Sequence, residues 1–153
     1  MIIVENFLSK VECEKLIKFY KNNLNKTEPY KDRKKLILHD SYGKGFTNNT
    51  FLNTIIKKYQ EIRPLDYLDN LEIVYWPEGN FMDWHDDTCY YTFSSITNLN
   101  SDYEGGRTRV ENFEVEPKIG KLVLFESSKL HKVTRLEKNN RYVIGAWYKD
   151  GPC

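Results

Sequence analysis

Residues 71–87 read "LEIVYWPEGNFMDWHDD" and contain two candidate strands separated by a Pro-Glu-Gly turn. Along the second strand, side chains alternate between the two faces of a sheet. One face then carries Phe81, Asp83, His85 and Asp87, and the other carries Met82, Trp84 and Asp86. The alternation predicts that His85 and Asp87 can bind one ion, whereas Asp86 cannot do so without a β-bulge.

The same strand-like composition continues toward the C-terminus. Short segments rich in aromatic and β-branched residues cover 92–100, 107–115, 121–127, 129–136 and 141–149. Turn-forming sequences such as "SDYEGG", "EPKIG" and "EKNN" separate several of them. Many short strands without helices between them indicate an antiparallel sandwich or barrel.

The N-terminal part has helical patterns instead. Ser9 followed by Glu12 forms a capping box, which predicts the start of a first helix. A second helix is predicted over residues 49–62, and Pro64 ends it. Between them, the Lys-rich segment 25–48 is predicted to be a mobile loop around a short strand. We expect one domain over residues 1–153, in which an N-terminal strand and helices (1–65) pack on one sheet of a β core (66–153).

Composition excludes several function classes. The chain has 153 residues and a formal net charge of +1. It therefore lacks the excess of basic residues that would predict a nucleic-acid partner. Cys13, Cys89 and Cys153 are widely spaced and support neither a disulfide framework nor a zinc finger. No apolar run predicts a membrane span or a signal peptide. These features predict a cytoplasmic protein, and the single alanine hints at a microbial or viral origin.

His131 lies 131 − 85 = 46 positions after His85 and could supply a third ligand. Two histidines and one carboxylate leave three coordination positions open, which suits non-haem Fe(II). Zinc accepts the same ligands, although its catalytic sites usually keep only one open position. On these residues alone, an ordinary polar turn and a half-buried strand histidine are the favoured explanation of the pattern.

Arg141 begins an otherwise apolar strand, where a charged side chain needs a partner. Its guanidinium could bind a carboxylate through two parallel hydrogen bonds, or it could extend to water at the strand end. If residues 129–136 and 141–149 form a hairpin, Arg141 faces the same way as His131 only with an odd loop or a bulge. We therefore predict one of these two features.

Residues 71–150 resemble the prolyl 4-hydroxylase group of Fe(II)- and 2-oxoglutarate-dependent dioxygenases. The resemblance rests on an ordered set of motifs: "YWPEGNFMDWHDD", "NLN", "YEGGRTRV", "VEPKIGKLVLFES", "LHKV" and "RYVIGAWYKD". The N-terminal "NFLSKVECEKLI" is also similar to the family's first strand and helix. The fold implied by the resemblance is a double-stranded β-helix, a jelly-roll core like that of cupins.

The resemblance also implies roles for single residues. His85, Asp87 and His131 match the iron ligands, and Arg141 matches the basic residue that binds the distal carboxylate of 2-oxoglutarate. Tyr75 matches a tyrosine that contacts this cosubstrate, and Trp147 matches an aromatic residue beside iron and substrate. Two positions depart from the pattern. Asn98 stands where some relatives have a second cosubstrate-binding tyrosine, and Arg107 stands where glutamate is common.

The implied reaction consumes 2-oxoglutarate and dioxygen at Fe(II), with ascorbate as a possible reductant, and hydroxylates a substrate C–H bond. The first expectation is a prolyl residue in a peptide or protein, bound by a monomeric enzyme along aromatic residues such as Trp76, Trp84, Tyr90, Tyr91 and Tyr103. The alternatives are a free amino acid or other small molecule, a modified base included, or a non-catalytic β-helix binding module.

Overall fold

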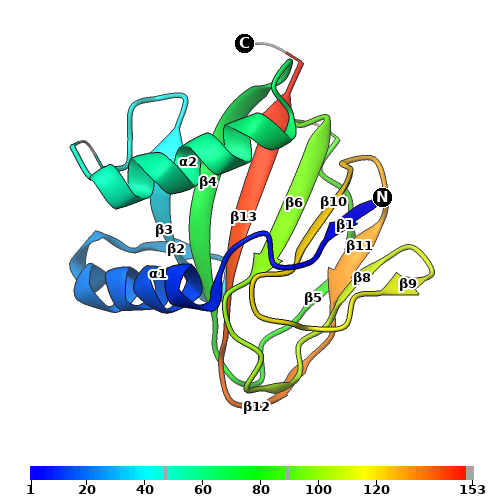
Figure 1. Ribbon diagram of the computed structural model, residues 1–153. Coiled ribbons are helices and arrows are strands. Elements are labelled where there is room, and N and C mark those ends of the chain that lie inside the picture. Colours follow the sequence, from blue (N-terminus) through cyan, green and yellow to red (C-terminus); the bar gives the residue numbers. More distant parts are fainter. Residues whose placement is uncertain (47, 89, 151–153) are drawn as a thin grey trace.

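The computed structural model describes residues 1–46, 48–88 and 90–150. Its strands form two main sheets and one small hairpin-like sheet. The large sheet has seven strands in the order β1-β10-β6-β13-β4-β3-β2, and the small sheet has four in the order β5-β11-β8-β9. A two-stranded sheet of β12 and β7 closes one end (Figure 1). This arrangement confirms the predicted double-stranded β-helix with flanking helices.

The elements follow one another along the chain with short connections. The large sheet contains β1 (Ile2–Val4), β2 (Glu28–Tyr30), β3 (Arg33–Asp40), β4 (Tyr67–Trp76), β6 (Phe93–Asn98), β10 (Leu122–Glu126) and β13 (Arg141–Lys149). The other strands are β5 (Met82–His85), β7 (Glu104–Gly105), β8 (Thr108–Val110), β9 (Phe113–Glu114), β11 (His131–Val133) and β12 (Leu136–Lys138). The helices are α1 (Lys10–Asn22), the 3-10 turn η1 (Leu24–Lys26) and α2 (Thr50–Ile62).

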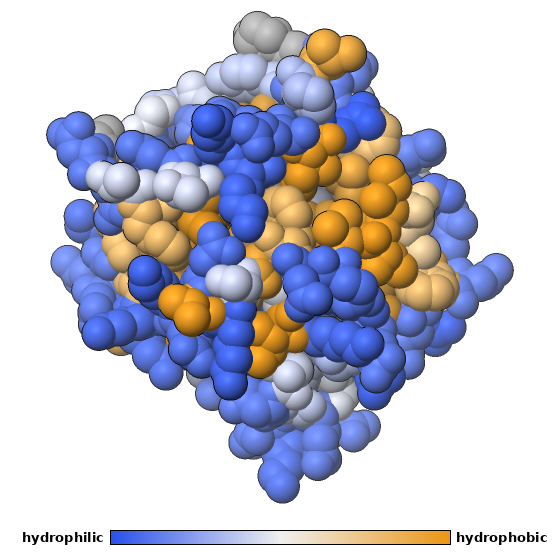
Figure 2. Space-filling model, viewed as in Figure 1, coloured by the Kyte–Doolittle hydropathy of each residue, from blue (hydrophilic) through white to orange (hydrophobic). Residues whose placement is uncertain are grey.

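Both α-helices cover the same outer face of the large sheet (Figure 1). α1 begins with the predicted capping box, in which Ser9 Oγ accepts from the Glu12 amide and the Glu12 carboxylate accepts from the Ser9 amide. α2 is capped by Asn49, whose side chain accepts from the Leu52 amide. Polar residues dominate the surface on this side, while an apolar band is visible between the helices and toward β1 (Figure 2).

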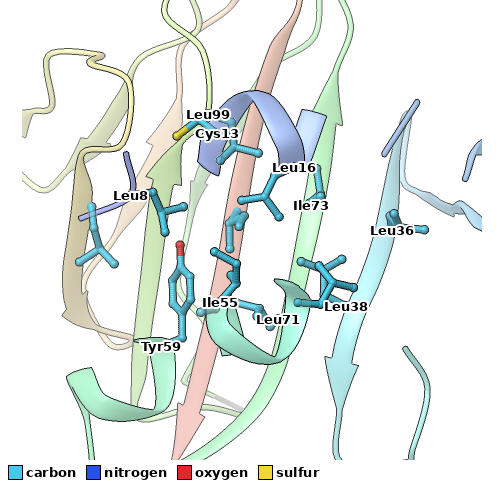
Figure 3. Packing of buried hydrophobic residues seen from close by; sticks show 14 of the residues in the cluster. Leu8, Cys13, Leu16, Leu36, Leu38, Ile55, Tyr59, Leu71, Ile73 and Leu99 are labelled. Carbon is cyan, nitrogen blue, oxygen red and sulfur yellow. The ribbon is translucent and has the colours of Figure 1, made fainter. Parts of the chain in front are cut away.

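The main hydrophobic core lies between the helices and the large sheet. Leu16 of α1 and Ile55 and Tyr59 of α2 are fully buried against Leu71 and Ile73 of β4 (Figure 3). Because this core occupies the outer face of the sheet, the inner face is free to turn toward the small sheet. The site described below therefore lies between the sheets and is separate from the main core.

The Lys-rich segment 25–48 differs from the prediction. It forms β2 and an eight-residue β3, and β3 pairs with β4 inside the large sheet. Leu36 and Leu38 face the helical core with exposed fractions of 1%, while the charged residues of β3 lie at its two ends. The high lysine content obscured this strand in the sequence, which is why a loop with a short strand was expected.

Two further sequence expectations concern cysteines and membranes. Cys13 is a buried free thiol, and burial raises its pKa to about 11, whereas Cys89 and Cys153 lie outside the described residues. Among the residues that the structure describes, no helix combines the length and the apolar character needed to cross a membrane.

Candidate functional site

Three side chains meet at the inner side of the small sheet. His85 ends β5, Asp87 follows two residues later, and His131 begins β11 directly opposite His85. One potential ligand atom from each residue lies within 4.8 Å of the other two. The two imidazole rings are 4.1 Å apart between centroids. Residues separated by 46 positions in the chain are thus brought to one point, as a three-ligand metal centre requires.

Backbone carbonyls set the tautomer of both histidines. His85 Nδ1 lies 2.8 Å from the Asp83 carbonyl oxygen, and His131 Nδ1 lies 2.9 Å from that of Lys129. Because a carbonyl oxygen only accepts hydrogen bonds, each Nδ1 carries the proton. Each Nε2 then keeps a free lone pair, which is how histidine ligands are commonly oriented. Burial also lowers the pKa of His85, so its imidazole stays neutral and able to bind a metal.

Asp87 is held by several donors. Its Oδ2 accepts from Ser94 Oγ at 2.8 Å and from Trp147 Nε1 at 3.2 Å. Burial raises the pKa of Asp87, but the adjacent His131 imidazole, whose Nε2 lies 3.4 Å from Asp87 Oδ2, and the hydrogen bonds from Ser94 and Trp147 outweigh this effect and lower the pKa. Asp86 is exposed and accepts instead from the amide and hydroxyl of Thr88. The structure therefore separates the two aspartates as strand alternation predicted.

An enclosed cavity extends from these residues between the two sheets. Its walls are mostly apolar, and the residues that line it are Tyr30, Val74, Trp76, Met82, His85, Asp87, Ser94, Ile96, Thr108, His131, Val133, Val143, Gly145 and Trp147. Few polar groups reach this cavity apart from the three candidate ligands. A small ligand inside it would be largely removed from water.

Arg141 adjoins this cavity through Thr108 and Trp76. Its side chain is 1% exposed, and Nη2 donates to Thr108 Oγ1 at 2.6 Å. Its Nε and Nη1 are buried without a partner, and so is Trp76 Nε1. Burial lowers the pKa of Arg141, an effect that the nearby Tyr103 hydroxyl opposes. Because a guanidinium remains charged in proteins, these unpaired donors fit a carboxylate ligand.

The family model that describes the 2OG-Fe(II) oxygenase superfamily matches residues 71–149. This match begins within β4, runs to the end of β13 and includes all three candidate ligands and Arg141. The chain belongs to this superfamily. It is thus an Fe(II)- and 2-oxoglutarate-dependent dioxygenase, as the sequence predicted. The donor set described above fits both the metal and the cosubstrate of the family.

Solved structures share the fold of this oxygenase. A viral collagen prolyl hydroxylase from Paramecium bursaria Chlorella virus-1, in complex with 2-oxoglutarate, aligns with a TM-score of 0.77 at 16% identity and covers 99% of this chain and 96% of its own. A Pseudomonas putida prolyl-4-hydroxylase aligns with a TM-score of 0.75 at 18% identity. The alignment covers 99% of this chain and 92% of the hydroxylase. A 2OG-Fe(II) oxygenase family oxidoreductase from Burkholderia pseudomallei aligns with a TM-score of 0.70 at 16% identity. The alignment covers 98% of this chain and 84% of the oxidoreductase. The comparison with curated proteins gave no match.

The oxygenase departs from strict alternation in β5. His131 pairs with His85 and Val133 with Met82, so three steps on β5 oppose two on β11. This β-bulge places Met82 on the cavity side with His85, while Asp83 and Trp84 are exposed. The predicted grouping of Phe81 and Asp83 with His85, and of Met82 with Trp84, is therefore wrong.

The condition for the predicted odd loop or bulge, a hairpin between residues 129–136 and 141–149, is not met. β11 belongs to the small sheet, whereas β13 lies in the large sheet between β4 and β6. His131 lines the cavity from the small sheet, and Arg141 lies beside the cavity in the large sheet, in the strand whose Val143 and Gly145 line it. The parity of a connecting loop consequently has no bearing on whether the two side chains converge.

Tyr75 does not reach the cavity of the oxygenase. Its ring packs against Tyr20 at 5.9 Å and Tyr142 at 5.2 Å, on the helical side of the large sheet. Its neighbours Val74 and Trp76 face the cavity instead. The geometry gives no support to the predicted cosubstrate contact of Tyr75. The sequence analysis named Trp76 only as a possible peptide contact, although alternation along 71–76 would have separated it from Tyr75 and placed it on the cavity side.

The remaining family positions fall in different places. Trp147 lines the cavity and contacts Asp87, whereas Arg107 is exposed and pairs with Glu114 at 3.3 Å, away from the candidate ligands. Asn98 is buried, and its Oδ1 accepts from the Tyr103 hydroxyl at 3.4 Å. Tyr103 thus lies between Asn98 and Arg141. The sequence contained no signal that these three residues would be neighbours.

Gly145 allows Trp147 to approach Asp87. A Cβ atom at position 145 would lie 2.4 Å from the ring carbon Cη2 of Trp147, closer than any real contact. We expect Gly145→Ala to displace the indole and remove its hydrogen bond to Asp87. Loss of such a partner typically weakens metal binding by about 10–100-fold. Equilibrium dialysis of Fe(II) under anaerobic conditions would measure this, with Ala146→Gly as a control on the other sheet face. Unchanged Fe(II) affinity in Gly145→Ala would contradict the positioning role of Trp147.

Proposed function

We propose that this dioxygenase hydroxylates a prolyl residue in a peptide or protein. The observation that carries the proposal is an open groove of about 340 Å³ that is continuous with the metal cavity. The two share Tyr30, Met82, His85, Asp87 and Trp147 as lining residues. A substrate bound in the groove would therefore present a C–H bond directly to the candidate metal ligands.

The chemistry of the groove suits a proline-containing peptide. Tyr30, Tyr90, Tyr91 and Trp147 line it. Aromatic surfaces bind pyrrolidine rings, and extended proline-rich segments leave their backbone carbonyls free to accept hydrogen bonds. Burial raises the pKa of Tyr30 to about 12, so its hydroxyl stays protonated and can donate to such a carbonyl. Two of the proteins with the same fold are named prolyl hydroxylases, which further supports this substrate class.

The residues of the chain have defined tasks in this proposal. His85 Nε2, His131 Nε2 and a carboxylate oxygen of Asp87 would hold Fe(II), with Ser94 and Trp147 orienting Asp87. Arg141, with Trp76 Nε1, would bind the distal carboxylate of 2-oxoglutarate. Together, iron and 2-oxoglutarate supply the activation of dioxygen, with succinate and carbon dioxide as coproducts. The apolar cavity walls exclude water from this chemistry.

All the residues named above come from one chain, so we propose that a monomer is competent for the reaction. We also propose a cytoplasmic setting, where reducing conditions keep thiols such as that of Cys13 free.

The test is incubation of the purified protein with Fe(II), 2-oxoglutarate and a library of proline-containing peptides. We expect peptide products heavier by one oxygen atom, formed together with succinate, and tandem mass spectrometry placing the oxygen on proline. A parallel set of free amino acids tests the small-molecule alternative. Succinate formation that rises with a free amino acid but with no peptide would contradict the proposal. Product formation must stop when the iron is removed by a chelator, which serves as the control.

A further inference from the structure

A buried ion pair lies in the wall of the substrate groove. Glu72 of β4 is 1% exposed, and its Oε2 lies 3.4 Å from Lys35 Nζ of the adjacent strand β3. The same oxygen accepts from Asn70 Nδ2 at 3.2 Å. All three residues line the groove that opens on the candidate metal ligands. They therefore form one connected polar group beside the reaction site.

Neither stability nor the iron chemistry accounts for this group. A buried ion pair generally contributes little net stability, because desolvation of both charges offsets their attraction. Burial indeed raises the pKa of Glu72, in opposition to Lys35. The residue paired with Glu72 on β13 is Gly145, which has no side chain to cover the carboxylate. A costly charged residue is thus retained on the inner face of β4, where Val74 and Trp76 also face the cavity.

The hydrogen bond from Asn70 to Glu72 fixes the orientation of the Asn70 amide. Because a carboxylate accepts, the group bound to it must be the NH₂ of Asn70. Its carbonyl oxygen Oδ1 is buried and has no partner. Asn70 pairs in register with Trp147, the residue that contacts Asp87. An unpaired acceptor is therefore held within one strand spacing of the side chain that adjoins the metal site.

We propose that Lys35, Glu72 and Asn70 form the subsite that binds the main-chain amide next to the oxidised residue of a peptide. Asn70 Oδ1 accepts from the peptide N–H, and Glu72 positions Asn70. The charges of Lys35 and Glu72 cancel, so the subsite matches a neutral amide. A free amino acid has no main-chain amide and cannot offer this neutral N–H to Asn70 Oδ1. This inference rests on the proposed function and predicts discrimination against free amino acids.

The experiment compares peptide kinetics across three variants of the full-length protein. Asn70→Leu removes the acceptor while keeping the side-chain shape. The double variant Lys35→Met, Glu72→Leu removes both charges together, which proteins with buried ion pairs usually tolerate. We expect each to raise the KM for the peptide about tenfold or more, because a buried substrate N–H loses its acceptor, with a smaller effect on kcat. Glu114→Gln, which breaks the exposed pair with Arg107, is the matched control and should leave this KM unchanged.

The readouts separate the inference from the proposed function. Calorimetry should show that 2-oxoglutarate binds the Asn70 and double variants about as tightly as it binds the wild type. A wild type that oxidises no peptide overturns both the function and the inference. A wild type that oxidises peptides, with an unchanged peptide KM in Asn70→Leu and in the double variant, overturns the inference alone. Loss of 2-oxoglutarate binding in both variants would also overturn it, since the group would then serve the cavity.

Discussion

Asp87→Asn should reduce 2-oxoglutarate turnover by at least about a hundredfold. Substitution of residues that only hydrogen-bond to metal ligands already lowers metal affinity or activity by about 10–100-fold. Asp87 contributes the only carboxylate among the three residues whose ligand atoms lie within 4.8 Å of one another. Asparagine preserves the size of the side chain but removes the negative charge that balances Fe(II). If the amide oxygen takes the position of Oδ2 and accepts from Ser94 Oγ and Trp147 Nε1, the amide NH₂ occupies the other carboxylate position, where it cannot bind a metal ion. Succinate formation and anaerobic Fe(II) binding would both measure the effect.

Asp86→Asn is the matched control for this change. Asp86 is exposed and bonds only to Thr88 in its own turn, so activity should stay within about twofold of the wild type. The two substitutions are chemically identical and one residue apart, and they differ only in the direction of the side chain. Equal losses from both variants would show that the metal does not sit between His85, Asp87 and His131.

Much of the fold was predictable because local patterns and packing agree. The capping box of Ser9 and Glu12 and the stop at Pro64 placed both helices within a few residues. Most strands after Leu71 were found for the same reason: β-branched and aromatic runs alternate with turn sequences. β3 was missed in part because it begins with Arg33, Lys34 and Lys35, and a lysine-rich strand resembles a loop when only composition is considered.

The candidate site was predictable in its membership but less so in its geometry. His85, Asp87 and His131 were identified through ordered motifs, yet their convergence depends on pairing between β5 and β11. The bulge in β5 has no sequence signal, since neither Asp83 nor Trp84 differs from ordinary strand residues. The hairpin considered for residues 129–136 and 141–149 does not form, because these two segments belong to different sheets, which the sequence does not indicate. Trp76 and Tyr103 were missed as neighbours of Arg141 for the same reason: their proximity is set by sheet packing.

Arg141→Met should weaken 2-oxoglutarate binding by at least about thirtyfold, since breaking one side of a buried charged pair costs about 2–5 kcal/mol. Arg141 Nε and Nη1 have no hydrogen-bond partner despite full burial. The cation is therefore under-compensated until a carboxylate binds. Methionine removes this unpaired charge at similar length. We thus expect the free energy of unfolding of the variant, measured without ligand, to equal or exceed that of the wild type.

Ligand-induced stabilisation distinguishes this account from simple damage to the fold. Added 2-oxoglutarate should raise the Tm of the wild type but not that of Arg141→Met, because only a protein that binds ligand gains from it. Arg141→Lys keeps the charge but loses the planar guanidinium. Its Tm increase with 2-oxoglutarate should therefore lie between those of the wild type and Arg141→Met. Calorimetric binding and thermal unfolding, measured with and without 2-oxoglutarate, test all three proteins. If Arg141→Met binds the cosubstrate as tightly as the wild type does, the unpaired guanidinium serves another anion, and the carboxylate must be bound elsewhere in the cavity.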